Sequence, residues 1–194
     1  MSTFHVFFEM GMRHILDWNG YDHLLFVIAL CLSFSVSSWK KIIGLLSAFT
    51  IGHSLSLALS TLHIIRVNSD IVEFLIPLTI FLTGLHHLIR GKKTSQKNSY
   101  WYGYGIVIAF GLIHGMGFSS YLSALLGRSE SIITPLLAFN LGLEVGQIVI
   151  VLAYFALFYL LNTIINHLQT YWKPAWTFII LAVSASLMYH ARFW

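Results

Sequence analysis

The sequence contains little charge and almost no cysteine. Only 9% of its 194 residues are Asp, Glu, Lys or Arg, whereas 57% are hydrophobic and the mean hydropathy is +0.78. Such a chain is too apolar for a soluble domain, so we expect an integral membrane protein. The single cysteine, Cys31, excludes an intramolecular disulfide, and the few basic residues form no continuous face that could bind nucleic acid.

The sequence contains several long apolar segments. A helix needs about 20 mostly apolar residues to cross about 30 Å of hydrocarbon. We predict an all-α fold, a polytopic membrane helix bundle in the lipid bilayer, built as a single domain over residues 1–194. About six transmembrane helices are predicted, at 21–38, 41–62, 71–89, 102–126, 132–162 and 174–192.

Residues 1–19 carry apolar side chains at helical spacing and have no compact apolar core. This pattern predicts an N-terminal amphipathic interfacial helix. We find no internal repeat in the sequence.

Lysine and arginine are concentrated in the loops after the first, third and fifth predicted spans, above all in the run RGKKTSQK at 90–97. Basic loops usually stay in the cytoplasm. The bias therefore predicts a protein of the bacterial inner (cytoplasmic) membrane with both termini outside.

Three ionisable residues fall near the middle of predicted spans. Counted at 1.5 Å per residue, His53, His114 and Glu144 each lie about 15–18 Å from a membrane edge. Ionisable groups are costly in lipid and normally face the interior of the bundle. We therefore predict a central metal site made by these three side chains, although a histidine in a membrane helix can instead be an interhelical hydrogen bond.

The neighbours of Glu144 favour this interpretation. Asn140 and Gln147 share its helical face and are predicted to orient the ligands from the second layer. Glycine pairs at 111/115 and 142/146 allow close helix approach, which is expected to bring His114 toward Glu144.

A second set of potential ligands lies where the first span begins. His14, Asp22 and His23 are predicted to bind metal there, although Asp22 could simply cap the helix. Imidazole and carboxylate ligands suit a divalent transition metal, namely Ni²⁺, Co²⁺ or Zn²⁺, as substrate or bound ion. The remaining histidines are interpreted as interfacial: His5, His63, His86, His87, His167 and His190.

The segments GMRHI, GYDHLLFVIAL, FTIGHSLSLALS, FGLIHGMGF and FNLGLEVGQ resemble the HupE/UreJ family, and more closely its HupE/UreJ-like second branch. The resemblance runs from Phe4 to Gln147. It implies a nickel permease associated with hydrogenase and urease gene clusters, with nickel or cobalt as the ion and metalloenzyme-maturation proteins as partners.

Two departures from the family pattern accompany the resemblance. Seven residues separate His14 from Asp22, whereas the family has five. Gly111 and Gly117 stand nearest to the places of a family histidine and glutamate. Our hypothesis is that Glu144 supplies the missing carboxylate.

Three functions remain open from the sequence. The first is membrane transport of a divalent transition metal through a His/Glu-lined path. The second is an intramembrane hydrolase, which would use either a metal or Ser119 or Ser120 with a histidine base. The third is a non-catalytic metal-sensing or assembly partner. Transport is favoured over an enzyme because the serine motif is weak.

Overall fold

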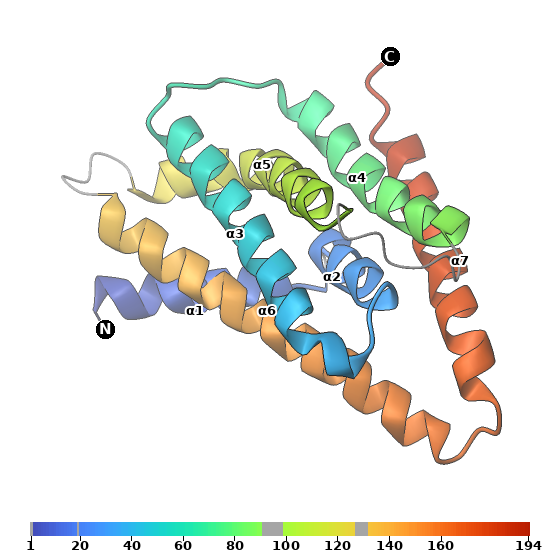
Figure 1. Ribbon diagram of the computed structural model, residues 1–194. Helices are drawn as coiled ribbons and strands as arrows, with labels where there is room; N and C mark the ends of the chain where they lie inside the picture. The colour runs from blue at the N-terminus through green and yellow to red at the C-terminus, as the bar shows by residue number, and fades with distance from the viewer. Residues whose placement is uncertain (1, 19, 91–98, 127–131) are drawn as a thin grey trace.

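The computed structural model describes residues 2–18, 20–90, 99–126 and 132–194, and these parts of the chain are helical (Figure 1). Most of the RGKKTSQK run, on which the predicted topology depends, lies outside the described residues. The helices are α1 (Thr3–Leu16), α2 (Asp22–Leu32), α3 (Trp39–Thr61), α4 (Ser69–Arg90), α5 (Ser99–Leu126), α6 (Ile133–Asn162) and α7 (Leu168–His190), with a 3₁₀ turn at Val36–Ser38.

Four segments among the described residues are long and apolar enough to cross a membrane, at Val36–Thr61, Ser69–Ile89, Gly103–Leu125 and Ile133–Asn162. The chain is a helical membrane protein, but the predicted count of six spans is not confirmed. The predicted span 21–38 is wrong as one helix, because α2 ends at Leu32 after 11 residues. That length covers only about 16 Å.

The first helix is packed into the bundle. α1 lies along α6, and both Gly11 and Ile15 are buried in this contact. The predicted position of α1 at the membrane interface is therefore not confirmed. A face with a buried glycine serves helix packing more directly than lipid contact.

Glycines determine how the two closest helix pairs pack. A Cβ atom on Gly111 of α5 would overlap the Phe49 carbonyl oxygen of α3, and one on Gly52 of α3 would overlap that of Ile108. The helices therefore touch backbone to backbone, which only glycine permits. Gly111 and Gly115 were expected to face α6, but they face α3.

The pair α1 and α6 repeats these contacts. A Cβ atom on Gly11 of α1 would overlap the Phe139 carbonyl oxygen, and one on Gly142 of α6 would overlap that of Phe8. In each of these helices the glycine lies three residues after the residue whose carbonyl is contacted. This holds for Phe8 and Gly11 of α1 as for Ile108 and Gly111 of α5, and for Phe139 and Gly142 of α6 as for Phe49 and Gly52 of α3. The two pairs thus share one register.

This equivalence reveals an internal repeat, so the prediction of none is wrong. α1 and α3 correspond to α5 and α6, and the helices that follow each pair in the chain, α4 and α7, pack against each other. The signal in the sequence is short: LSAFTIG at 46–52 matches LLAFNLG at 136–142, and GMRH at 11–14 matches GLIH at 111–114. In Figure 1 α3 and α6 run in opposite directions, and so do α1 and α5, as in an inverted repeat.

α2 has no counterpart in the second half, where only residues 127–132 separate α5 from α6. It lies in the middle of the bundle and contacts α1, α3, α4, α6 and α7. Its residues from Leu25 to Leu32 are all buried, as expected for a helix that is apolar on every side. Asp22 and His23, at its start, are thereby carried into the interior.

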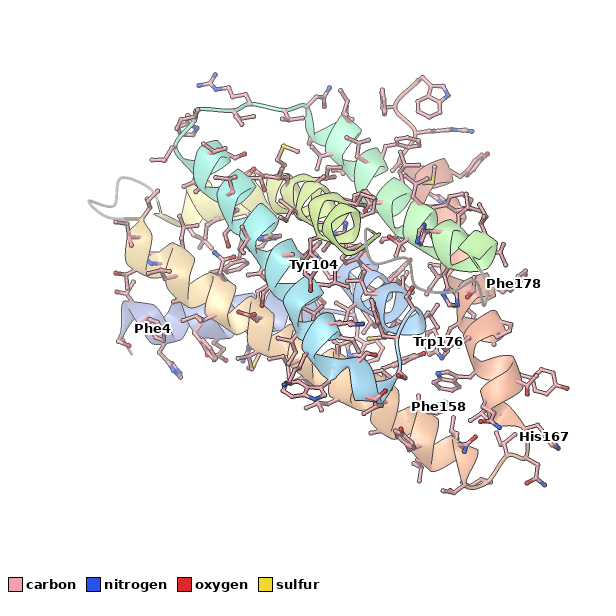
Figure 2. All side chains as sticks on the ribbon, in the orientation of Figure 1. Phe4, Tyr104, Phe158, His167, Trp176 and Phe178 are labelled. Carbon is pink, nitrogen blue, oxygen red and sulfur yellow. The ribbon has the colours of Figure 1, made fainter. Side chains whose placement is uncertain are left out.

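The contacts between α6 and α7 are mainly aromatic. Trp172 donates its indole N–H to the Tyr154 hydroxyl at 2.9 Å. Figure 2 shows Trp176 and Phe158 between the two helices and Phe178 pointing away from the bundle. The contacts that position the histidines lie elsewhere, in the glycine-packed pairs and α2.

Candidate metal site

Four histidines from four helices meet in the core of the bundle. His23 of α2 is central, with ring centroids 4.7 Å from His14 of α1, 5.1 Å from His114 of α5 and 6.1 Å from His53 of α3. With Asp22 they form what we call the histidine cluster. The two predicted sites therefore form one cluster: His14, Asp22 and His23, which were predicted at the membrane surface, lie together with His53 and His114, which were predicted at the centre.

The glycine contacts explain this convergence. His14 and His114 each lie one helical turn after the glycine that touches the facing backbone, and His53 follows Gly52 directly. A residue three or four positions along a helix lies on the same face. Close backbone contact therefore aims these imidazoles toward the space where α2 begins.

Two groups within the cluster could each hold an ion. One ligand atom each from His14, His23 and His53 lie within 4.8 Å of one another, and so do those of Asp22, His23 and His114. Metal–nitrogen bonds of about 2.0–2.1 Å bring ligand atoms to about 3–4 Å, so modest side-chain movement would close either group. His23 belongs to both groups.

The buried ring nitrogens carry few hydrogen bonds. His23, His53 and His114 are at most 4% exposed. Among the described residues no hydrogen-bond partner exists for His14 Nε2, His23 Nε2, His114 Nδ1 or either nitrogen of His53. Burial of unsatisfied polar atoms destabilises a fold, so atoms retained in this state are candidates for binding a ligand.

Thr79 of α4 determines which nitrogen of His114 is free. Its hydroxyl donates to the Ile76 carbonyl at 2.7 Å and lies 2.9 Å from His114 Nε2. Since the hydroxyl hydrogen is already used, Nε2 must donate its own hydrogen to Thr79 Oγ1. The lone pair is then left on Nδ1, which is buried without a hydrogen-bond partner among the described residues, and outer groups prepare histidine ligands in this way. Nothing in the sequence marked Thr79.

We expect Thr79→Val to weaken metal binding about 10- to 100-fold, because the valine cannot fix the imidazole tautomer or orientation. Thr79→Ser, which keeps the hydroxyl, should restore affinity. Equilibrium titration of the purified protein with Co²⁺ measures both. A purely structural role for Thr79 would be indicated if serine and valine variants bound alike.

Phenylalanine rings surround the cluster. Phe118 lies 4.2 Å from His14, Phe49 lies 5.1 Å from His114, and Phe139 lies 6.1 Å from His53, between ring centroids. Phe26 completes the wall, 5.4 Å from His114. An apolar wall excludes water and strengthens electrostatic attraction between an ion and its ligands.

The structure places Glu144 apart from both ligand groups. Its carboxylate accepts a hydrogen bond of 2.5 Å from Ser47 Oγ, across the contact between α3 and α6. Gln147 is fully buried and accepts a bond of 3.2 Å from Thr50, while Asn140 donates to the Leu136 carbonyl at 2.7 Å. The expected approach of Glu144 to His114 does not occur, because the glycine faces of α5 and α6 pack on α3 and α1.

The departures from the family pattern have structural explanations. The backbone of Phe49 occupies the space that a side chain at position 111 would need. In the longer segment between His14 and Asp22, Trp18 is 81% exposed and takes no part in the cluster. Ser119 uses its hydroxyl within its own helix, as a donor to Met116 at 2.7 Å.

The fold and the histidine cluster define a helical membrane protein with a candidate transition-metal site. A family model described as HupE / UreJ protein matches residues 1–194, which is the whole chain. The chain therefore belongs to the HupE/UreJ family. No curated protein and no solved structure matches it.

Proposed function

We propose that this protein transports a divalent transition metal ion, nickel or cobalt by family relationship, and that the histidine cluster is its binding site. The observation that carries the proposal is the convergence of buried ring nitrogens without partners from four helices. Neutral imidazole with one carboxylate suits Ni²⁺, Co²⁺ and Zn²⁺. The ion is the substrate, and metalloenzyme-maturation proteins are its proposed recipients.

The repeat supports transport over catalysis. Many secondary transporters are built from inverted repeats and bind their substrate between them. The cluster takes His14 from the α1–α6 pair, His53 and His114 from the α3–α5 pair, and Asp22 and His23 from α2. It therefore lies where movement of one pair relative to the other would change access.

Glu144 is proposed to act after the cluster on the ion's path. The polar groups of α3 continue from His53 to Thr50 and Ser47, which bond to Gln147 and Glu144. Asn140 lies one helical turn before Glu144, on the same face of α6. These oxygen and amide groups are weaker ligands than the cluster, which suits release.

Flux and binding measurements separate the two roles. In vesicles containing the purified protein, we expect His23→Ala to abolish both Ni²⁺ influx and equilibrium binding. Glu144→Gln should lower influx at least about tenfold while equilibrium binding stays within about twofold, because an interaction is lost in transit rather than at the site.

His5→Ala, which alters an exposed histidine of α1, is the matched control and should change neither quantity. Parent protein that binds Ni²⁺ tightly without any flux would overturn transport and favour an intramembrane metal-dependent hydrolase or a metal sensor. Loss of binding in Glu144→Gln would return Glu144 to the binding site itself.

A further inference from the structure

A cavity of about 380 Å³ opens beside the histidine cluster. It is an open cavity lined by the start of α2, the first turns of α4 and the end of α7. The topology predicted from the charge bias would put these three helix ends on the outer side of the membrane. We call this cavity the vestibule.

Asp22 connects the vestibule to the cluster. Its carboxylate lines the cavity and also belongs to the ligand group with His23 and His114. The Asp22 side chain is 24% exposed, whereas that of His23 is 5% exposed. An ion in the vestibule would therefore meet Asp22 before it reached the buried imidazoles.

Two further ligand-type side chains line the vestibule, Glu73 of α4 and His190 of α7. His190 Nδ1 lies 2.7 Å from the Ser186 carbonyl oxygen, which can only accept, so Nδ1 carries the hydrogen. The lone pair of the neutral ring is then on Nε2, as in a histidine prepared for metal binding. Neither residue lies in one of the five motifs quoted above for the family resemblance.

The size and spacing of the vestibule suit a hydrated ion. Six waters at about 30 Å³ each need about 180 Å³, which the cavity can hold. Among the described residues, Glu73 and His190 belong to no group of three or more ligand residues whose ligand atoms lie within 4.8 Å of one another. They can attract an ion and bind it through water, but they do not form a tight chelate.

We propose that Glu73 and His190 form a capture site for a hydrated divalent transition-metal cation, which passes it to Asp22 at the edge of the cluster. This inference rests on the proposed function of the cluster. Removing water stepwise, first at Asp22 and then at the buried histidines, divides the desolvation of the ion into smaller steps.

The test is the rate of Co²⁺ binding by the full chain, purified without a histidine tag and followed by the visible absorption of the bound ion. We expect the double variant Glu73→Gln, His190→Gln to bind Co²⁺ about fivefold more slowly at low ionic strength, with the difference shrinking as salt is added. The final spectrum and stoichiometry should equal those of the parent.

The matched control is Asp70→Asn with His63→Gln, which makes the same kinds of change at exposed positions outside the vestibule. Its binding rate should equal that of the parent. Equal rates in all three proteins would overturn the capture site and leave the cluster standing. Loss of the final spectrum in the vestibule variant would also overturn it, because the residues would then belong to the binding site. A parent without any Co²⁺ spectrum would overturn both proposals.

Discussion

Replacement of His53 by leucine should make the metal-free protein more stable while it abolishes metal binding. His53 is completely buried, and neither ring nitrogen has a hydrogen-bond partner among the described residues. An unsatisfied buried polar group destabilises the folded state by about 1–3 kcal/mol. The equivalent position of the other repeat is Leu143, also completely buried, so leucine suits this helix contact.

Chemical unfolding in detergent of metal-free His53→Leu measures the stability change, and we expect a gain of about 1–3 kcal/mol. Titration with Ni²⁺ should show affinity reduced more than about 100-fold, since loss of a direct ligand exceeds the effect of an outer residue. His5→Leu, at an exposed position, should leave affinity unchanged. Destabilisation by His53→Leu would contradict the ligand role and identify the imidazole as a structural hydrogen-bonding group.

This combination distinguishes a binding site from polar groups that hold helices together. A histidine that stabilises the bundle lowers stability when replaced, whereas a histidine kept for function raises it. His114 is less suitable for this comparison, because its replacement would also remove the hydrogen bond between its Nε2 and Thr79. His53 is therefore the most informative position.

The sequence predicted the class of fold and the residue types of the site better than their arrangement. Composition and apolar runs correctly indicated a helical membrane protein. Counting residues from a membrane edge placed His53 and His114 together, but the same method separated His14 and His23 from them. Depth counted along a helix fails when a helix is short and enters the bundle at an angle set by its neighbours, as α1 and α2 do.

The sequence also did not predict which helix packs against each glycine face. Gly111 and Gly142 indicated close packing, but a small residue does not encode which helix fills the space beside it. The repeat could have resolved this, because matching GMRH with GLIH assigns α1 and α5 the same role. Thr79, Glu73 and His190 had no comparable signal, since their roles depend on contacts between distant helices.

Gly111→Ala and Gly105→Ala should differ sharply, although both add one methyl group to α5. At Gly111 the new Cβ atom would overlap the Phe49 carbonyl oxygen, whereas at Gly105 it would meet nothing within 4 Å. Overpacking against backbone costs about 1–3 kcal/mol or more, because backbone cannot move aside as a flexible side chain can. At an open helix position alanine is instead favoured by up to about 1 kcal/mol.

Unfolding in detergent measures this difference, and the repeat extends the prediction to the other helix pair. Gly11→Ala of α1 should lose about as much stability as Gly111→Ala, because its Cβ atom would overlap the Phe139 carbonyl oxygen in the same register. Both substitutions should also weaken metal binding. His14 lies one helical turn after Gly11 and His114 one turn after Gly111, so a shift of either helix would move that histidine relative to His23. Equal stability of Gly111→Ala and Gly105→Ala would contradict the backbone contact, whereas a loss at Gly111 without one at Gly11 would contradict the equivalence of the two repeats. In that case the α1–α6 and α3–α5 contacts would not share one register. The cluster could then no longer be described as lying between two equivalent halves.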